Sequence, residues 1–151
     1  MAEAGNNIRL HEMFNIEGGN FTSAGSISSQ VKKVLKGAGF SSKVIRRTSI
    51  ATFEAEMNVI CYANQGKLSL FITPNFLKVV VEDEGIGIPD VNQAMREGYS
   101  TANEKIRELG FGAGMGLSNI KKNTDEMILT SESGQGTHLE FIIYLDNQNK
   151  E

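Results

Sequence analysis

The spacing of apolar residues changes along this chain and predicts the order of its elements. Residues 8–16 carry apolar side chains at nearly alternate positions, which predicts a first strand. Residues 23–35 and 41–63 carry them at intervals of three and four, which predicts two helices, the second broken near Arg46-Arg47. Glycines lie between these segments, at Gly18-Gly19 and again at Gly37 and Gly39, where the chain is expected to turn.

The second half of the chain predicts a strand pair, two helices and another strand pair. The expected elements are strands 67–73 and 76–82 around Pro74-Asn75, a helix over 90–97, a polar loop over 98–109, a helix over 117–127, and strands 128–131 and 137–145. This order predicts an α+β fold, a two-layer sandwich in which a mixed, mostly antiparallel sheet carries its helices on one face.

Composition narrows the class of protein without naming it. A chain of 151 residues that is 40% hydrophobic predicts one domain, over residues 8–145, with disordered ends at 1–7 and 146–151. A net charge of −3 gives no general attraction to nucleic acid or to an anionic membrane. The single cysteine, Cys61, cannot form an internal disulfide, and no apolar run approaches the roughly 20 residues that span a bilayer. We therefore expect a cytoplasmic protein that binds neither nucleic acid nor membrane.

The first candidate for chemistry is the pair Glu54 and Asn58 in the segment FEAEMN. Residues four apart share one face of a helix, so the two side chains should project together beside the apolar stripe, whereas Glu56 points elsewhere. A carboxylate there suits a general base, and an amide oxygen one turn later suits Mg²⁺. Taken alone, the pair is more simply interpreted as a solvated helix flank.

The second candidate is the segment Asp83-Glu84-Gly85-Ile86-Gly87, which follows an apolar strand. Asp83 is expected at the end of that strand, where its carboxylate can accept a hydrogen bond from an exocyclic amine. The simpler interpretation is an aspartate that bonds its own turn, which is common in such sequences.

The third candidate is the glycine-rich segment before the helix expected at Leu117. Its glycines alternate at Gly110, Gly112, Gly114 and Gly116, with Met115 between the last two. Backbone N–H groups at the start of a helix favour phosphate, although a flexible hinge would use the same residues. The spacing fits neither the dinucleotide-binding glycine motif nor a Walker A loop, which ends in Gly-Lys-Ser/Thr.

Other polar residues are weaker candidates. Ser100 and Thr101 open the polar loop and can donate to phosphate or cap a turn, and Arg107 is either a surface charge or a phosphate clamp. His11 and His138 have no cysteine or carboxylate at ligand spacing and are expected to be ordinary strand residues.

Taken in order, these segments resemble the ATP-binding domain shared by gyrase, the chaperone of ninety kilodaltons, histidine kinases and mismatch-repair MutL, with its Bergerat-type fold. Nearly the whole chain resembles the small anti-sigma-factor serine/threonine kinases. The stretches EDEGIGIPDVNQAMREGYST and GAGMGLSNIKKNTDEM, together with Tyr62-Ala63, most resemble the switch-kinase subgroup, whose members phosphorylate a small STAS-domain partner.

The resemblance implies roles for the matching residues. Glu54 would activate the acceptor hydroxyl, Asn58 would hold Mg²⁺, and Asp83 with Thr137 would read the adenine of ATP. The remaining ATP-binding residues would be Gly85, Gly87, Ser100, Thr101, Gly110, Gly112, Gly114, Met115, Gly116 and Leu117. The partners implied are a STAS-domain antagonist, a sigma factor or a phosphatase of the PP2C type, and a second copy in a homodimer.

Three functions remain open at this point. A protein serine/threonine kinase explains the whole set of motifs. A non-catalytic anti-sigma protein gated by ATP needs the same pocket but no base, and Glu54 argues mildly against it. An ATP-driven dimerisation clamp would require a further domain to transmit hydrolysis, for which 151 residues leave no room.

Overall fold

The computed structural model describes residues 8–85, 116–132 and 134–145. Its centre is a five-stranded sheet in the order β1-β2-β3-β5-β4, and every pairing among these strands is antiparallel. The strands are β1 (Leu10–Glu17), β2 (Ala63–Ile72), β3 (Phe76–Gly85), β4 (Glu126–Glu132) and β5 (Gly136–Tyr144). The helices are α2 (Ser26–Gly37), α3 (Ser42–Tyr62) and α6 (Gly116–Lys122), with a short 3₁₀ turn, η1, at Phe21–Ser23.

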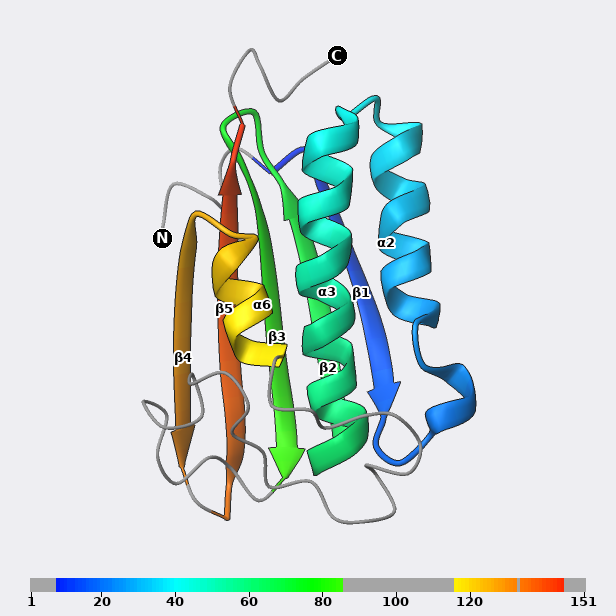
Figure 1. The fold of residues 1–151 in the computed structure, drawn as a ribbon, viewed down its shortest axis with the longest axis vertical. Helices are drawn as coiled ribbons and strands as arrows, with labels where there is room; N and C mark the ends of the chain where they lie inside the picture. Colours follow the sequence, from blue (N-terminus) through cyan, green and yellow to red (C-terminus); the bar gives the residue numbers. More distant parts are fainter. Residues whose placement is uncertain (1–7, 86–115, 133, 146–151) are drawn as a thin grey trace.

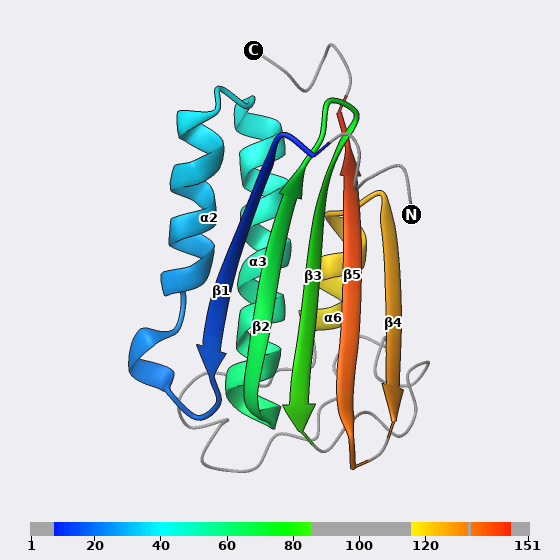
Figure 2. The same ribbon diagram turned by 180° about the vertical axis from the view of Figure 1, so that it is seen from behind.

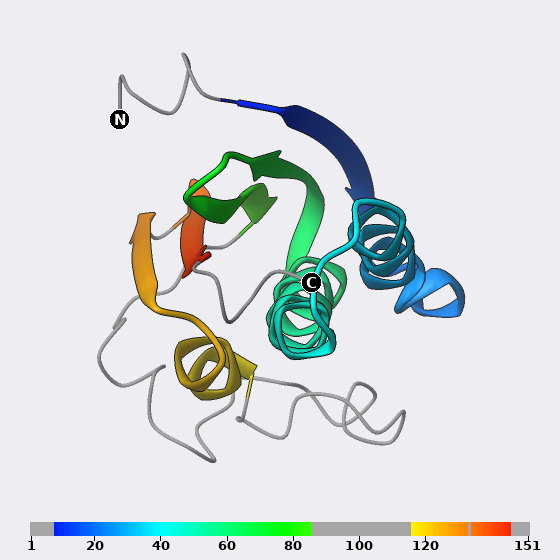
Figure 3. The same ribbon diagram turned by 90° about the horizontal axis from the view of Figure 1, so that it is seen from above.

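The helices form a single layer over one face of the sheet, so the predicted two-layer α+β sandwich is confirmed. Figure 1 looks onto the helices, Figure 2 onto the opposite face of the sheet, and Figure 3 shows the curved sheet and the helix layer end-on. α3 lies between α2 and α6 and contacts both of them. None of the helices in the described part of the chain is long and apolar enough to cross a membrane.

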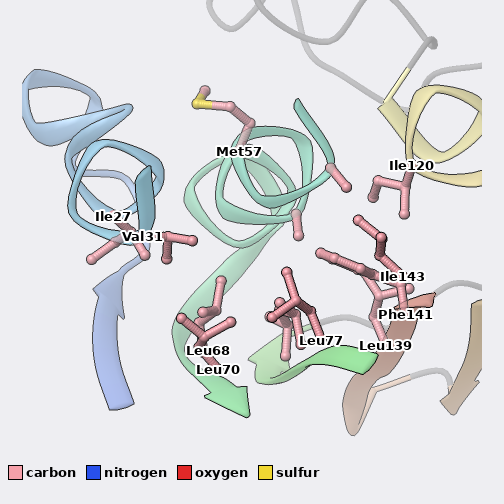
Figure 4. Close-up of a cluster of buried hydrophobic side chains, with 14 of the residues drawn as sticks. Ile27, Val31, Met57, Leu68, Leu70, Leu77, Ile120, Leu139, Phe141 and Ile143 are labelled. Carbon is pink, nitrogen blue, oxygen red and sulfur yellow. The ribbon is translucent and has the colours of Figure 1, made fainter. Parts of the chain in front are cut away.

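The core lies between the helix layer and the sheet. Every second side chain along the central strands is apolar and faces the helices. In the β2–β3 hairpin, Leu68 pairs with Val81 and Leu70 with Val79, and all four side chains are buried. β5 adds Leu139, Phe141 and Ile143 to the same face, and Ile120 of α6 meets them from the helix layer (Figure 4). Burial of these side chains, at about 1.5–3 kcal/mol each, holds the helices on the sheet.

α3 is continuous, so the break predicted near Arg46-Arg47 is wrong. The helix begins after Ser41, whose Oγ accepts a hydrogen bond from the N–H of Val44 at 3.3 Å. Arg46 lies on the exposed side, and Arg47 forms an ion pair with Asp125 at 2.9 Å. The arginines thus occupy the solvent flank, while the buried face of the helix runs on without interruption.

α6 is shorter than the predicted helix over 117–127. The side-chain amide of Asn123 donates to the carbonyl of Asn119 at 2.8 Å, and the hydroxyl of Thr124 donates to the carbonyl of Ile120 at 2.9 Å. The N–H of Asp125 then donates to Ile142 of the sheet, at 2.9 Å. These side chains satisfy carbonyls that a longer helix would have bonded, so β4 begins at Glu126 rather than at residue 128.

α3 passes into β2 without an intervening residue, since the helix ends at Tyr62 and the strand begins at Ala63. Two glycines border this junction. A Cβ at Gly18 would overlap the carbonyl oxygen of Ala63, and a Cβ at Gly85 would lie 2.8 Å from the carbonyl oxygen of Tyr62. The close approach of three backbone segments therefore needs glycine at both positions.

Candidate functional site

The predicted site residues that the structure describes gather at one end of the sandwich. This end contains the last turns of α3, the end of β3 and the start of β5, at the bottom of Figure 1, and α6 begins higher up, beside the lower half of α3. The predicted helix over 90–97 and loop over 98–109 lie outside the described residues, as do both termini. The same holds for Gly87, Ser100, Thr101, Gly110, Gly112, Gly114 and Met115, whose roles stay predictions.

Glu54 and Asn58 share one face of α3 and both point toward Gly116. A Cβ built on Gly116 would lie 3.2 Å from Oε2 of Glu54 and 3.5 Å from Oδ1 of Asn58. Gly116, the last residue of the glycine-rich segment, therefore lies next to the carboxylate of Glu54 and the amide of Asn58. A methyl group at Gly116 would press on Oε2 of Glu54 and would be in ordinary van der Waals contact with Asn58.

Burial and one hydrogen bond set the acidity of Glu54. Burial raises the pKa of its carboxyl above the ordinary value, and a hydrogen bond with the side chain of Asn119 on α6 partly opposes this rise. A carboxylate held at the edge of the core is a better proton acceptor than one in water. Asn119 was not identified from the sequence, although it lies three residues after Gly116 and so on the same face of the predicted helix.

Asn58 offers an oxygen atom of the kind that Mg²⁺ prefers. Mg²⁺ is usually held by one or two protein oxygens, with phosphate oxygens and water completing the octahedron. Within the described ranges no group of three histidine, cysteine, aspartate or glutamate side chains could hold a metal by itself. The amide oxygen of Asn58 is therefore the protein ligand that this face of α3 would offer to a magnesium ion held mainly by phosphate oxygens and water.

Asp83 is fixed by the start of β5. Its Oδ1 accepts a hydrogen bond from the N–H of Thr137 at 3.0 Å, and burial raises the pKa of the carboxyl despite this bond. Gly136 has φ +120°, and a Cβ there would overlap the backbone oxygen of Asp83. The expectation that Asp83 ends its strand is wrong by two residues, because β3 continues to Gly85.

Hydrogen bonds between hydroxyl groups connect Thr137 with Ser131 of β4. The Oγ of Ser131 donates to the carbonyl of Gly136 at 2.9 Å and lies 3.0 Å from Oγ1 of Thr137. Because Ser131 has a single hydroxyl proton, Thr137 is the donor between the two hydroxyls. The oxygen of Thr137 keeps a lone pair for a ligand, and Asp83 keeps its second carboxylate oxygen. Sequence reasoning missed Ser131, which pairs with Thr137 across the β4–β5 hairpin.

Two neighbours on α3 have other roles. The carboxylate of Glu56 is 1% exposed and accepts hydrogen bonds from the N–H groups of Gly25, Ile27 and Ser28, at 3.1, 3.3 and 3.1 Å. Glu56 therefore points away from the site, as predicted, and caps α2. Cys61 packs against the core, and burial together with the charge of Glu54 raises the pKa of its thiol to about 11. Such a thiol stays protonated and is a poor nucleophile.

The two histidines and Leu117 make other contacts. His11 stacks on Phe71, with ring centroids 4.3 Å apart, and His138 of β5 contacts Glu140 at 3.0 Å. The side chain of Leu117 joins the hydrophobic core, so only its backbone is available to a ligand.

A carboxylate and an amide on a central helix, a half-buried aspartate on the sheet and a glycine at the start of the next helix are the arrangement expected of an ATPase-type domain. The model of the family described as "Histidine kinase-, DNA gyrase B-, and HSP90-like ATPase" matches residues 44–149, and the chain belongs to this family.

Relatives narrow the group further. Serine/threonine-protein kinase RsbT of Bacillus subtilis is 32% identical over 118 residues, which cover 76% of this chain and 83% of the relative. An anti-sigma F factor of Caldanaerobacter subterraneus is 34% identical over 100 residues, 63% of this chain and 66% of that protein. Among solved structures, the SiaB-SiaC complex from Pseudomonas aeruginosa matches with a TM-score of 0.57 and 12% identity over 95% of this chain and 94% of that one, which shows the fold.

Proposed function

We propose that this protein is an ATP- and Mg²⁺-dependent serine/threonine kinase that phosphorylates a STAS-domain partner in a bacterial regulatory switch. The observation that carries the proposal is the half-buried carboxylate of Glu54, which lies beside Asn58 and against Gly116. The similarity to a serine/threonine kinase over 76% of the chain supports it. A cytoplasmic location and a single domain over residues 8–145 belong to the same proposal.

Glu54 would act as the general base. The oxygen of the acceptor hydroxyl forms a bond to the γ-phosphorus while the bond from that phosphorus to the β–γ bridging oxygen breaks, and ADP leaves. The hydroxyl proton passes to a carboxylate oxygen of Glu54, whose pKa is raised by burial. Mg²⁺, when bound through Asn58 and the phosphates, would neutralise charge on the transferred group.

Asp83 and Thr137 would select adenine. The carboxylate oxygen of Asp83 that Thr137 does not occupy can accept from the exocyclic amine of adenine, and the Thr137 hydroxyl lies next to it. Guanine presents a carbonyl at that position and would leave two acceptors facing each other, at a cost of about 1–3 kcal/mol. ATP should therefore bind at least about tenfold more tightly than GTP.

A second candidate is a non-catalytic anti-sigma protein gated by ATP. It is favoured by the identity with anti-sigma F factors, at 34% over 100 residues. Such a protein would bind a sigma factor or a STAS-domain protein in one nucleotide state and release it in the other. In the kinase proposal, by contrast, a PP2C-type phosphatase would reverse the phosphorylation of the partner, and in either case a second copy of the chain would complete a dimer.

Transfer of labelled phosphate from ATP separates the two candidates. The STAS-domain proteins encoded beside the gene are the first substrates to try. Glu54→Gln keeps the shape of the side chain but cannot take a proton, so transfer should fall by roughly 10²–10⁴-fold while ATP affinity is retained. Glu12→Gln, at an exposed position on β1, is the matched control. Full activity of Glu54→Gln, or partner binding without transfer in the wild type, would refute the kinase assignment.

A further inference from the structure

Three polar side chains form one row across β3, β5 and β4, which are neighbours in the sheet (Figure 2). Ser131 of β4 faces Thr137 of β5 in the strand register. On the other side of β5, the N–H of Thr137 donates to Oδ1 of Asp83 at 3.0 Å. The register of β3 with β5 also places Asp83 opposite Thr137, one step beyond the pair Glu82 and His138. Residues that face each other on neighbouring strands point to the same side of a sheet, so the three side chains lie next to one another.

The positions of the hydroxyl oxygens in this row leave one arrangement of their protons. Oγ of Ser131 lies 2.9 Å from the carbonyl oxygen of Gly136 and 3.0 Å from Oγ1 of Thr137. A carbonyl oxygen can only accept, so the first hydrogen bond uses the single proton of Ser131. The second contact is then a hydrogen bond only if Thr137 donates. The hydroxyl proton of Thr137 therefore points toward β4, and its oxygen presents lone pairs to a ligand.

The row thus offers a ligand two acceptors and no donor from its side chains. A carboxylate accepts through both of its oxygens, and Thr137 occupies only one oxygen of Asp83. A hydroxyl group ordinarily rotates and either donates or accepts, as its neighbour requires. Ser131 removes that choice from Thr137, because it needs the Thr137 proton to complete its own hydrogen bond.

Purines differ in how they would meet two acceptors. The 6-position of adenine carries an amine with two N–H groups, whereas that of hypoxanthine carries a carbonyl, which only accepts. An amine can donate to both oxygens, but a carbonyl would leave acceptors facing each other without a proton between them. Guanine has the same carbonyl and a further amine at the 2-position, so hypoxanthine isolates the effect of the 6-position.

We propose that Ser131 is a positioning residue for base selection, which holds the Thr137 hydroxyl as an acceptor so that the site binds a 6-amino purine and rejects a 6-oxo purine. This inference rests on the proposed function, in which Asp83 and Thr137 read the base of ATP. Without the Ser131 hydroxyl, Thr137 could turn its proton toward the ligand and donate to a carbonyl. Ser131 would therefore set selectivity without touching the nucleotide itself.

Calorimetric titration in Mg²⁺ with ATP and with inosine triphosphate, whose base is hypoxanthine, measures the effect. The wild type should bind ATP at least about tenfold more tightly than inosine triphosphate. In Ser131→Ala this ratio should fall by about two- to tenfold, the worth of one hydrogen bond between neutral groups. The change should come mainly from tighter binding of inosine triphosphate. A merely structural role would instead weaken both nucleotides alike and leave the ratio unchanged.

Further variants show whether Ser131 acts through Thr137. In Thr137→Val, which lacks the hydroxyl, the additional change Ser131→Ala should not alter the ratio. Ser131→Thr restores a hydroxyl and should restore most of the wild-type ratio. Ser131→Cys, whose thiol is a weak acceptor, should shift the ratio as Ser131→Ala does and gives a second test if the alanine variant does not fold. Thr130→Ala, at the exposed neighbouring position on β4, is the matched control and should keep both affinities.

The possible outcomes separate this inference from the proposed function. If the wild type prefers ATP but the ratio is unchanged in Ser131→Ala, or if it falls equally in the Thr137→Val background, the role of Ser131 alone is overturned. Equal binding of the two nucleotides by the wild type, or binding of neither, would refute the base-reading role of Asp83 and Thr137 and this inference with it. If Ser131→Ala relaxes the preference but the wild type transfers no phosphate, the inference stands and the kinase assignment is wrong.

Discussion

Glu56→Ala should destabilise the protein strongly because it removes the acceptor at the start of α2. Oε2 of Glu56 accepts from Gly25 and Ile27, and Oε1 accepts from Ser28. The cap residue of α2, Gly25, has no side chain, and no acidic residue lies in the first turn of that helix. The carboxylate of Glu56 therefore replaces the missing N-cap from a distance of 28 to 31 residues along the chain.

The size of the effect follows from these contacts. A buried N–H without an acceptor costs about 1–3 kcal/mol. Burial raises the pKa of Glu56, so removing its charge relieves part of that cost. Together these terms predict that Glu56→Ala lowers the free energy of unfolding by about 2–4 kcal/mol. Glu56→Gln should lose less, about 1–2 kcal/mol, because its oxygen can replace Oε2 while its amide faces the N–H of Ser28, donor against donor.

Urea unfolding followed by circular dichroism measures both variants, with Glu12→Ala at an exposed site as the control. Amide hydrogen exchange adds a local test: in Glu56→Ala the N–H groups of Ile27 and Ser28 should lose more protection than those of β3. If both variants stay within about 0.5 kcal/mol of the wild type, or if Glu56→Gln is the less stable of the two, the interpretation of Glu56 as the cap of α2 is wrong.

Three further predictions concern the site. Burial raises the pKa of Asp83 in the folded protein above its ordinary value of 3.8. The protonated carboxyl therefore contributes fully to stability below pH 3.8, and this contribution is lost as the pH rises through the raised pKa. Asp83→Asn, which still accepts from Thr137, should therefore lose less stability than the wild type between pH 3.8 and pH 7 in urea unfolding, and parallel curves would contradict this. Gly136→Ala should lower the free energy of unfolding by at least about 2 kcal/mol, because φ is +120° and the methyl group would overlap Asp83, and unchanged stability would refute that contact. Asn58→Ala should weaken ATP binding far more in Mg²⁺ than in EDTA, as measured by calorimetry, and equal weakening in both buffers would remove Asn58 as a metal ligand.

Local sequence patterns predicted a helix or strand well where the spacing of its apolar residues matches the face that the fold buries. α3 and the β2–β3 hairpin were predicted from apolar spacing, because each buries one face against the other, although α3 has no break and β2 begins at Ala63 rather than at residue 67. The end of α6 was predicted too late, since the side chains of Asn123 and Thr124 bond back to helix carbonyls, which hydropathy does not register.

From the sequence, site residues could be placed side by side only where they lie on the same helix. Glu54 and Asn58 follow from helical spacing, which places them on one face. Asn119 and Ser131 act through contacts with α3 and β5, and such contacts become visible only when the topology is known. Glu56 was correctly set aside from the site, but its partners lie on another helix and no local pattern identifies them.

The direct passage from α3 into β2 restricts how this chain can change length during evolution. One residue inserted at Tyr62-Ala63 would rotate α3 by about 100° relative to the sheet, or move the side chains of β2 to the opposite face. The first change would turn Glu54 and Asn58 away from Gly116, the second would remove Leu68 and Leu70 from the core, and Gly18 and Gly85 leave no space for the extra residue. Insertions and deletions in homologous chains should therefore be absent between Glu54 and Leu68. They should accumulate instead at the Pro74-Asn75 turn, at the far end of the hairpin.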